Sequence, residues 1–276
     1  MKEMFLVGHG ISHSLSPAMW NHLLQSTGRQ VRYGLRDVDI DGLTEVTAEL
    51  HSGTVVAANV TMPYKAWAAG VADEASEVVT ATGVANLLIP GESLRAHNTD
   101  VIGARTTLEA RAPYESVLVL GAGGTAVALL EALAGLATSV MVTNRSPDRA
   151  MELAERFEHR FASTDAVPWD DRDGHVPTAD LVVSTIPVTD VAPIDVTRLR
   201  SHALVYDAVY RRQPTGFQQA LTDRGIPVAD GLAHLAAQAI AMLTPLEYSP
   251  NEARFLVEGL ARATGREPRA WGTPLS

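Results

Sequence analysis

The chain of 276 residues contains no cysteine. Disulfide bonds, thiolate nucleophiles and cysteine-based metal sites are therefore excluded. The histidines give little sign of a metal site either, because the HExxH pattern is absent. His9 and His13 are separated by Gly10 in what reads as a strand-to-loop exit, where helical i, i+4 ligation of a metal is not expected. We expect no metal site.

Basic residues are in deficit: 22 Lys and Arg stand against 32 Asp and Glu, which gives a net charge of −10. This balance disfavours non-specific binding to nucleic acid or to anionic membranes. Long apolar runs are also missing, so no membrane span is expected, and the apolar run near the N-terminus is too short for a signal peptide. We expect a soluble, cytoplasmic protein of one large or two ordinary domains, either a monomer or a homodimer.

Strand and helix patterns alternate along the chain. Residues 1–103 mix the two without a phosphate-binding loop, and near-continuous apolar strands joined by helices follow from Val117 onward. That second pattern is typical of a doubly wound parallel sheet, so the predicted fold class is α/β with two domains. We predict a surface loop over 164–178. A final helix is expected after a Ser249–Glu252 capping box.

The first motif with chemistry is GAGGTA, which follows a predicted strand and opens a predicted helix. Its glycines permit a tight turn and let the backbone approach a pyrophosphate at the helix N-terminus. Glycine-rich turns are common, but this strand–loop–helix context favours a dinucleotide. The loop residues expected to bind the cofactor are Gly121, Ala122, Gly123, Gly124, Thr125 and Ala126.

The end of the next strand indicates which dinucleotide binds. An NAD site usually places an acidic residue there, whereas this chain has Asn144, Arg145 and Ser146, with Arg149 one turn later. A guanidinium can pair with a 2′-phosphate and stack on adenine. We therefore predict NADP(H); the alternative is that these arginines are simply solvated at a helix start. Asp148 suits the first turn of that helix.

A second set of polar residues lies in the first domain, where predicted strands give way to helices. NVTMPYK carries Asn59, Thr61 and Lys65, and HNTDVIG carries Asn98 and Asp100. Polar groups at strand ends line ligand sites in open α/β sheets. If Lys65 and Asp100 meet, they form an acid–base pair; taken singly, each reads as an exposed charge.

The ordered motifs make the chain resemble the shikimate dehydrogenase family over essentially its full length. They are HSLSP, NVTMPYK, GVAN, NTDVIG, GAGGTA, TNRSPDRA, DAVY and GLAHLAAQA. The resemblance implies reversible hydride transfer from NADPH to the ketone of 3-dehydroshikimate, with Lys65 and Asp100 as the catalytic pair. It also implies that Ser14 and Ser16 hold the substrate carboxylate with Tyr210. Ring hydroxyls would be bound by Thr61, Asn86, Asp100 and Gln238.

The resemblance further places Thr185 and Gly231 on the cofactor side. It implies a substrate-binding domain (1–103), an NADP-binding Rossmann domain (104–231) and C-terminal helices (232–276) that return to the first domain. The spacing of the two serines, in a segment expected to be extended, would point both hydroxyls the same way. The chain departs from the family pattern at Trp20, Leu87, Arg211-Arg212 and His234.

Two alternatives remain open from the sequence. A quinate/shikimate dehydrogenase with a preference for NAD would be expected to carry an acidic residue at the strand end, and Ser16 and Asn144-Arg145 argue against it. A non-catalytic NADP-binding sensor on the same fold would bind nucleotide without turnover, and the presence of both Lys65 and Asp100 argues against that.

Overall fold

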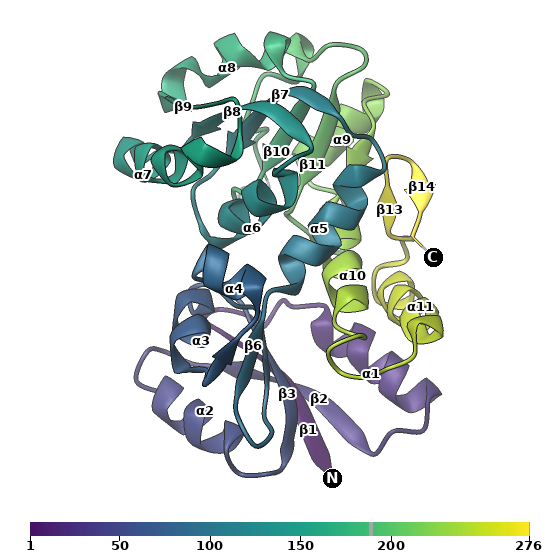
Figure 1. The fold of residues 1–276 in the computed structure, drawn as a ribbon. Coiled ribbons are helices and arrows are strands. Elements are labelled where there is room, and N and C mark those ends of the chain that lie inside the picture. The colour runs from purple at the N-terminus through teal and green to yellow at the C-terminus, as the bar shows by residue number, and fades with distance from the viewer. Residues whose placement is uncertain (188–189, 276) are drawn as a thin grey trace. The chain divides into compact units, whose positions relative to one another are not determined.

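The computed structural model describes residues 1–187 and 190–275, and its contacts divide the chain into two compact units (Figure 1). Unit 1 comprises residues 1–102 and 238–267, and unit 2 comprises 103–237 and 268–275. The prediction that all of 232–276 returns to the first domain differs from this division. Residues 232–237 belong to unit 2 because helix α10 (Gly231–Ala241) runs through the boundary, and 268–275 add a hairpin to the second sheet. Ser276 lies outside the described residues.

Unit 1 is built on a six-stranded mixed sheet in the order β2-β1-β3-β5-β6-β4. Strand β1 pairs in parallel with β2 and β3, while β5 and β6 form an antiparallel hairpin around Pro90-Gly91. The inner strand β1 is buried from Met4 to Val7, as expected for a strand covered on both faces. The strands are β1 (Lys2–Gly8), β2 (Val31–Asp37), β3 (Val55–Val60), β4 (Glu74–Ala75), β5 (Leu87–Ile89) and β6 (Arg95–His97).

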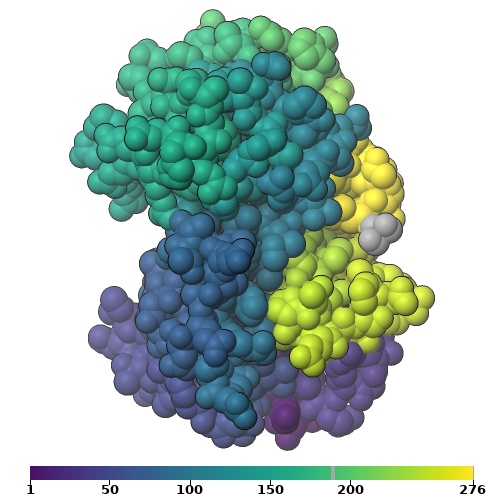
Figure 2. Space-filling model, viewed as in Figure 1, coloured from purple at the N-terminus to yellow at the C-terminus, as the bar shows by residue number. Residues whose placement is uncertain are grey.

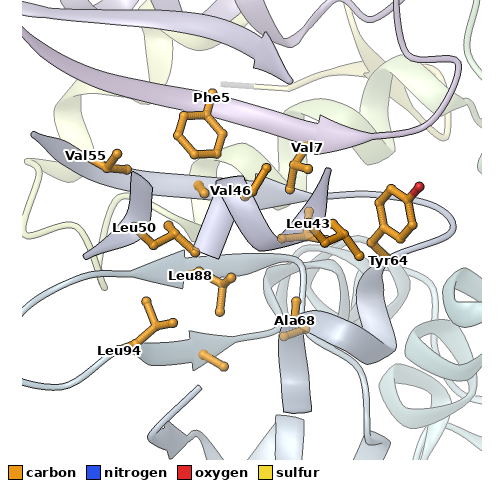
Figure 3. Packing of buried hydrophobic residues seen from close by; sticks show 14 of the residues in the cluster. Phe5, Val7, Leu43, Val46, Leu50, Val55, Tyr64, Ala68, Leu88 and Leu94 are labelled. Carbon is orange, nitrogen blue, oxygen red and sulfur yellow. The ribbon is translucent and has the colours of Figure 1, made fainter. Parts of the chain in front are cut away.

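One face of this sheet packs against two helices that precede and follow β3. Phe5, Val7 and Leu88 lie against Leu43 and Ala68 of those helices (Figure 3). Burial of this apolar face holds α3 against the sheet. Lys65, the first residue of α3, is thereby held near the end of β3. The helices of unit 1 are α1 (Ser16–Ser26), α2 (Leu43–Leu50), α3 (Lys65–Val71), α4 (Glu77–Thr82), α11 (Ala253–Thr264) and the 3-10 turn η5 (Pro250–Glu252).

Helices α1 and α11 pack together although more than two hundred residues separate them in the chain. Gly259 of α11 meets the backbone of Met19 in α1, and Trp20 stacks on Tyr33 of β2 with ring centroids 6.0 Å apart. Figure 2 shows part of α11, in yellow-green, at the surface of unit 1. The C-terminal segment thus packs on α1, the helix that follows the first strand of unit 1.

Unit 2 contains a parallel sheet in the order β12-β11-β10-β7-β8-β9, extended at one edge by the antiparallel β13 and β14. Counted from β7, the parallel order is that of a Rossmann fold, 3-2-1-4-5-6, which confirms the predicted doubly wound sheet. The strands are β7 (Tyr114–Leu120), β8 (Ala137–Thr143), β9 (Ser163–Val167), β10 (Leu181–Ser184), β11 (Leu204–Asp207), β12 (Val228–Ala229), β13 (Arg269–Ala270) and β14 (Thr273–Pro274).

Helices pack on this sheet around a second core. Leu118 and Val205 on one face contact Phe217 and Leu221 of α9. The helices are α6 (Gly124–Leu133), α7 (Pro147–Phe157), α8 (Arg172–His175) and α9 (Gly216–Asp223), with 3-10 turns η1 (Glu158–Arg160), η2 (Trp169–Asp171), η3 (Val176–Thr178) and η4 (Val196–Arg198). Helix α5 (Thr99–Glu109), like α10, spans the boundary between the units.

The surface loop predicted over 164–178 is wrong. Residues 163–167 form β9, which pairs in parallel with β8, and two 3-10 turns and α8 follow. Arg172 stacks over the Trp169 ring at 4.1 Å and donates to the Trp169 carbonyl, while Val176 is fully buried. These contacts order a segment whose charged composition suggested a loop.

Candidate active site

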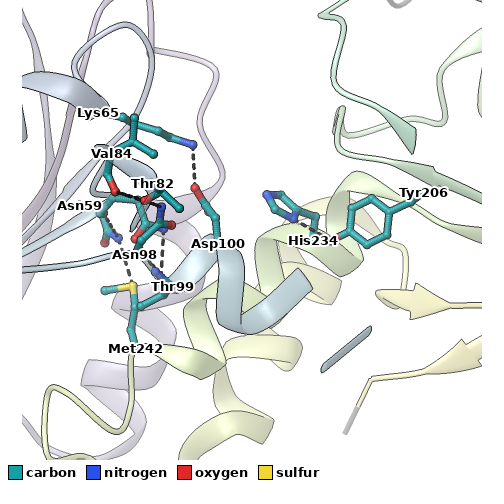
Figure 4. A network of polar contacts seen from close by, with 11 residues as sticks. Asn59, Lys65, Thr82, Val84, Asn98, Thr99, Asp100, Tyr206, His234 and Met242 are labelled. Carbon is teal, nitrogen blue, oxygen red and sulfur yellow. Dashed lines mark hydrogen bonds and ion pairs between the residues drawn. The ribbon is translucent and has the colours of Figure 1, made fainter. Parts of the chain in front are cut away.

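Lys65 and Asp100 form an ion pair in unit 1. Lys65 begins α3 after the turn that follows β3, and Asp100 lies in the first turn of α5 just after β6. Their Nζ and Oδ2 atoms are 2.7 Å apart, and the side chains are only 12% and 7% exposed (Figure 4). Two strand ends therefore bring together the two residues that the sequence suggested as an acid–base pair.

The chain has only two lysines, Lys2 and Lys65. Lys2 is exposed, whereas Lys65 is mostly withdrawn from water. Burying an ion pair costs desolvation energy that its attraction often does not repay, so a buried pair is weak evidence for a purely stabilising role. A charged pair at the ends of strands in an α/β sheet is a candidate for catalysis.

The start of α5 is held by amide side chains. Asn86 Oδ1 accepts from the Thr99 N–H at 2.8 Å, and Asn86 Nδ2 donates to Thr99 Oγ1 at 3.0 Å. Asn98 Nδ2 donates to the Val84 carbonyl at 3.0 Å. These bonds fix the turn that carries Asp100, so Asn86 supports the acid in addition to any ligand contact that the resemblance implies.

Asn59 and Asn98 were candidates for ligand binding because they lie at strand ends, but both have buried partners within the protein. Asn59 Oδ1 accepts from the Tyr33 hydroxyl at 2.8 Å, and its Nδ2 donates to the Asn86 carbonyl at 3.2 Å. Figure 4 shows both amides among the polar contacts of unit 1. Thr61 is half-buried, and its carbonyl accepts from the Tyr64 N–H to form the turn before α3. Sequence position alone did not distinguish the supporting amides from ligand-facing groups.

Ser14 ends a turn and Ser16 begins α1, so the predicted extended segment is wrong. The Ser14 N–H donates to the Ile11 carbonyl, and Ser14 Oγ accepts from the Ser16 N–H at 3.2 Å. Leu15 has helical dihedral angles because Ser16 already begins α1, with Pro17 in its first turn. The alternation argument therefore does not apply to these two serines.

This turn is anchored by Asp37, a residue that the sequence analysis missed. The Asp37 carboxylate, at the end of β2, accepts from the Gly10 N–H at 2.7 Å and from the Ile11 N–H at 3.0 Å. Gly10 has φ +69°, which favours glycine. Only the position of Asp37 at a strand end signalled this role.

The glycine loop of unit 2 has the geometry that a dinucleotide requires. Gly121 follows β7 with φ +111°, and a Cβ at this position would collide with Thr185 Oγ1. Thr185 in turn donates to the Leu120 carbonyl at 3.0 Å, at the point where the strand order reverses between β7 and β10. Gly123 is extended and leads into the N-terminal turn of α6, whose N–H groups suit a pyrophosphate.

The end of β8 provides the groups expected for a 2′-phosphate. Arg145 and Arg149 are exposed there, and Asn144 Nδ2 donates to the Ser146 carbonyl at 3.1 Å to shape the turn. Asp148 lies in the first turn of α7, as predicted. The glycine loop and this cationic strand end together fit NADP(H).

Three further predicted residues lie on or beside α10. A Cβ on Gly231, the first residue of this helix, would overlap the Val209 carbonyl, so the chain passes closely there. Gln238 is buried in α10 and belongs to unit 1, whereas Tyr210 belongs to unit 2. His234 Nδ1 shares a hydrogen bond of 2.8 Å with the Tyr206 hydroxyl, which accounts for this polar residue inside α10 (Figure 4).

In the described ranges, no three His, Asp or Glu side chains gather in a way that could hold a metal ion. A helix with the length and apolar character needed to cross a membrane is likewise not found among residues 1–187 and 190–275.

The Rossmann strand order and the glycine loop with its cationic strand end are the features of an α/β oxidoreductase that uses NADP. Comparison with known proteins identifies the family. A model described as the shikimate dehydrogenase substrate binding domain matches residues 6–88, and one described as shikimate / quinate 5-dehydrogenase matches residues 104–194. The chain belongs to the shikimate dehydrogenase family.

Individual relatives agree with this assignment. The chain is 35% identical over 247 residues to the shikimate dehydrogenase (NADP(+)) of Geobacter sulfurreducens, covering 84% of this chain and 86% of that protein. The shikimate 5-dehydrogenase of Thermus thermophilus, solved in complex with NADP(H) and shikimate, is 30% identical with a TM-score of 0.82, covering 95% of this chain and 100% of that one. A quinate dehydrogenase from Corynebacterium glutamicum in complex with NAD is 26% identical with a TM-score of 0.82, covering 95% and 99% of the two chains.

Proposed function

We propose that this protein catalyses the reversible NADPH-dependent reduction of 3-dehydroshikimate to shikimate, with Lys65 and Asp100 as the acid–base pair. The observation that carries the proposal is the buried contact of 2.7 Å between these two side chains. It lies within a unit whose residues 6–88 match a shikimate dehydrogenase substrate binding domain.

When bound, NADPH would supply a hydride to the carbonyl carbon of the substrate. Negative charge then grows on the carbonyl oxygen, and Lys65 stabilises that charge and transfers a proton from Nζ to the oxygen. Hydride and proton together convert the ketone into a secondary alcohol. Asp100 accepts a hydrogen bond from Lys65 and keeps Nζ aimed, and in the oxidative direction Lys65 takes the proton from the alcohol.

We assign the remaining predicted residues to two binding tasks. Ser14, Ser16 and Tyr210 donate hydrogen bonds to the substrate carboxylate, and charge-assisted bonds of this kind are about twice as strong as neutral ones. The ring hydroxyls meet groups that can donate and accept, which suits a triol. These groups are Thr61, Asn86, Asp100 and Gln238.

The cofactor contacts follow from unit 2. The glycine loop would hold the pyrophosphate, and Arg145 and Arg149 would pair with the 2′-phosphate. Quinate oxidation with NAD is the second candidate, because the Corynebacterium glutamicum enzyme shares the fold. The end of β8 argues against NAD in this chain, since Asn144 and Arg145 lie where an NAD site usually has an acidic residue.

Replacement of Lys65 tests the catalytic assignment. Lys65→Ala is expected to lower kcat for shikimate oxidation by about 10²–10⁴-fold, because proton transfer by a positioned side chain contributes that much. The KM for NADP should stay within a few-fold, since Lys65 lies in unit 1. Lys2→Ala is the matched control, because it removes the chain's other lysine from an exposed position. Equal kcat values for the two variants would remove Lys65 from the mechanism.

A further inference from the structure

The segment that leaves β11 is tied to α9 by one buried amide. Gln218 Nε2 donates to Asp207 Oδ2 and to the Val209 carbonyl, each at 2.8 Å. Asp207 Oδ1 also accepts from the Val209 N–H at 3.3 Å. Because Asp207 and Gln218 are both buried, these bonds are not exchanged with bulk water.

The orientation of this amide is fixed by the helix to which it belongs. Gln218 Oε1 accepts from the Thr215 N–H at 3.2 Å, and Thr215 Oγ1 accepts from the Gln218 N–H at 3.1 Å. This reciprocal capping box uses the carbonyl oxygen, so both amide hydrogens point toward the β11 exit. A side chain of similar size without N–H donors would remove the hydrogen bonds to Asp207 Oδ2 and to the Val209 carbonyl.

The same segment is confined on another side by the start of α10. Gly231 lies so close to the Val209 carbonyl and the Tyr210 N–H that no other residue fits without a backbone shift. The peptide between Asp207 and Tyr210 is therefore held by a side-chain clamp and by direct backbone packing.

We propose that Gln218 is a positioning residue that fixes the 207–210 segment and thereby the backbone that carries Tyr210, which the proposed function assigns to the substrate carboxylate. This inference rests on the proposed function, because it assigns to Tyr210 a contact with shikimate. Gln218 itself touches no reacting atom. Its effect is on the orientation of Tyr210 and hence on substrate affinity.

The test compares Gln218→Leu with Gln219→Leu in the full-length enzyme. Gln219 is the adjacent residue, and its Nε2 bonds the exposed Asp223 on the same helix, so it is a matched control. In Gln218→Leu the KM for shikimate should rise about tenfold, while kcat changes less than about threefold. Leaving a buried hydrogen-bond partner unsatisfied costs a free energy that corresponds to a change in affinity of about this size. Gln219→Leu should leave both values unchanged.

A double-mutant cycle with Tyr210→Phe shows whether Gln218 acts through Tyr210. If it does, Gln218→Leu should add little to the KM of the Tyr210→Phe enzyme, since residues that share one effect are not additive. Gln218→Met is a second variant of similar length that has no N–H donors, and it serves if the leucine variant does not fold. It should show the same rise in KM.

The outcomes separate the two proposals. If wild-type enzyme does not turn over shikimate, the proposed function fails before any variant is measured. If wild type is active and a folded Gln218 variant keeps its KM for shikimate, or if its effect adds fully to that of Tyr210→Phe, the positioning role is overturned.

Discussion

Asp207 is an acid whose surroundings oppose its charge. It is 2% exposed at the end of β11. Burial raises its pKa from 3.8 to about 7, and the nearby Asp230 also raises it, although hydrogen bonds from Gln218, Val209 and Ser184 act in the opposite direction. Near neutral pH this carboxyl therefore changes its protonation state inside the folded protein.

The raised pKa predicts a pH dependence of stability. Below about pH 4 the carboxyl is protonated in both the folded and unfolded chain, and this site favours neither. Between 3.8 and about 7 the unfolded chain ionises while the folded one stays neutral, so the free energy of unfolding falls as pH rises, by roughly 4 kcal/mol in total. Above that range the contribution is constant.

Asp207→Asn removes this titration and keeps the shape of the side chain. Urea unfolding at a series of pH values should show the variant gaining stability relative to wild type from about pH 4 to about 7, with no further gain above. A difference between the two proteins that stays the same over this range would show that Asp207 does not titrate as described.

Sequence position predicted some single residues well and others poorly. Lys65 and Asp100 each closely follow a strand, and strand ends converge at one edge of a sheet, so the sequence allowed them to meet; the family resemblance then paired them, and the structure brings them together. Asn59 has a similar position but bonds Tyr33 inside the protein. Asp37 accepts from backbone N–H groups far away in the chain, and no local pattern predicts such partners.

At the scale of elements, the contact between α1 and α11 depends on a glycine in α11. Gly259 faces Met19, and a Cβ there would lie 2.9 Å from the Met19 Cα and 3.0 Å from the His22 Cβ. The two helices can approach this closely only because residue 259 has no side chain. At the edge of the same contact, His22 Nε2 and Glu258 Oε2 lie 3.2 Å apart, within hydrogen-bond distance.

Gly259→Ala should therefore destabilise the protein despite the better helix propensity of alanine. Overpacking a close contact costs about 1–3 kcal/mol, against a gain of up to about 1 kcal/mol from propensity. Gly70→Ala in α3 is the matched control, since its Cβ would meet nothing within 4 Å and should stabilise the helix. Thermal unfolding should show a lower Tm for Gly259→Ala and an unchanged or higher Tm for Gly70→Ala. The opposite ranking would contradict the close contact.

Elements were predictable where the pattern is local. The apolar β7 strand, the glycine loop and α6 follow from about twenty residues of sequence. The predicted capping box at Ser249 is wrong in detail, because Ser249 Oγ accepts from the Asn251 N–H and a 3-10 turn precedes α11. Glu252 instead pairs with Arg29 at 2.9 Å, a tertiary contact that outweighs the local motif.

At the scale of the whole molecule, the chain crosses between two units that each have their own sheet. Residues 238–267 return to unit 1, and 268–275 then add β13 and β14 to the sheet of unit 2. Hydrophobic periodicity identifies helices but not the sheet on which they pack. The return of the C-terminal helices to the first domain was therefore expected only from the family resemblance, and the hairpin of β13 and β14 was not predicted. The proposed function draws on unit 1, which carries Lys65, and on unit 2, which carries Arg145.

The most direct test of the central claim is the initial rate of nicotinamide reduction by wild-type protein in the four combinations of shikimate or quinate with NADP or NAD. Shikimate with NADP is expected to give the highest kcat/KM, and 3-dehydroshikimate should in turn consume NADPH. A higher kcat/KM for quinate with NAD would contradict the substrate and cofactor assigned to this site. NADP binding without turnover of shikimate would contradict its assignment as an enzyme of this reaction.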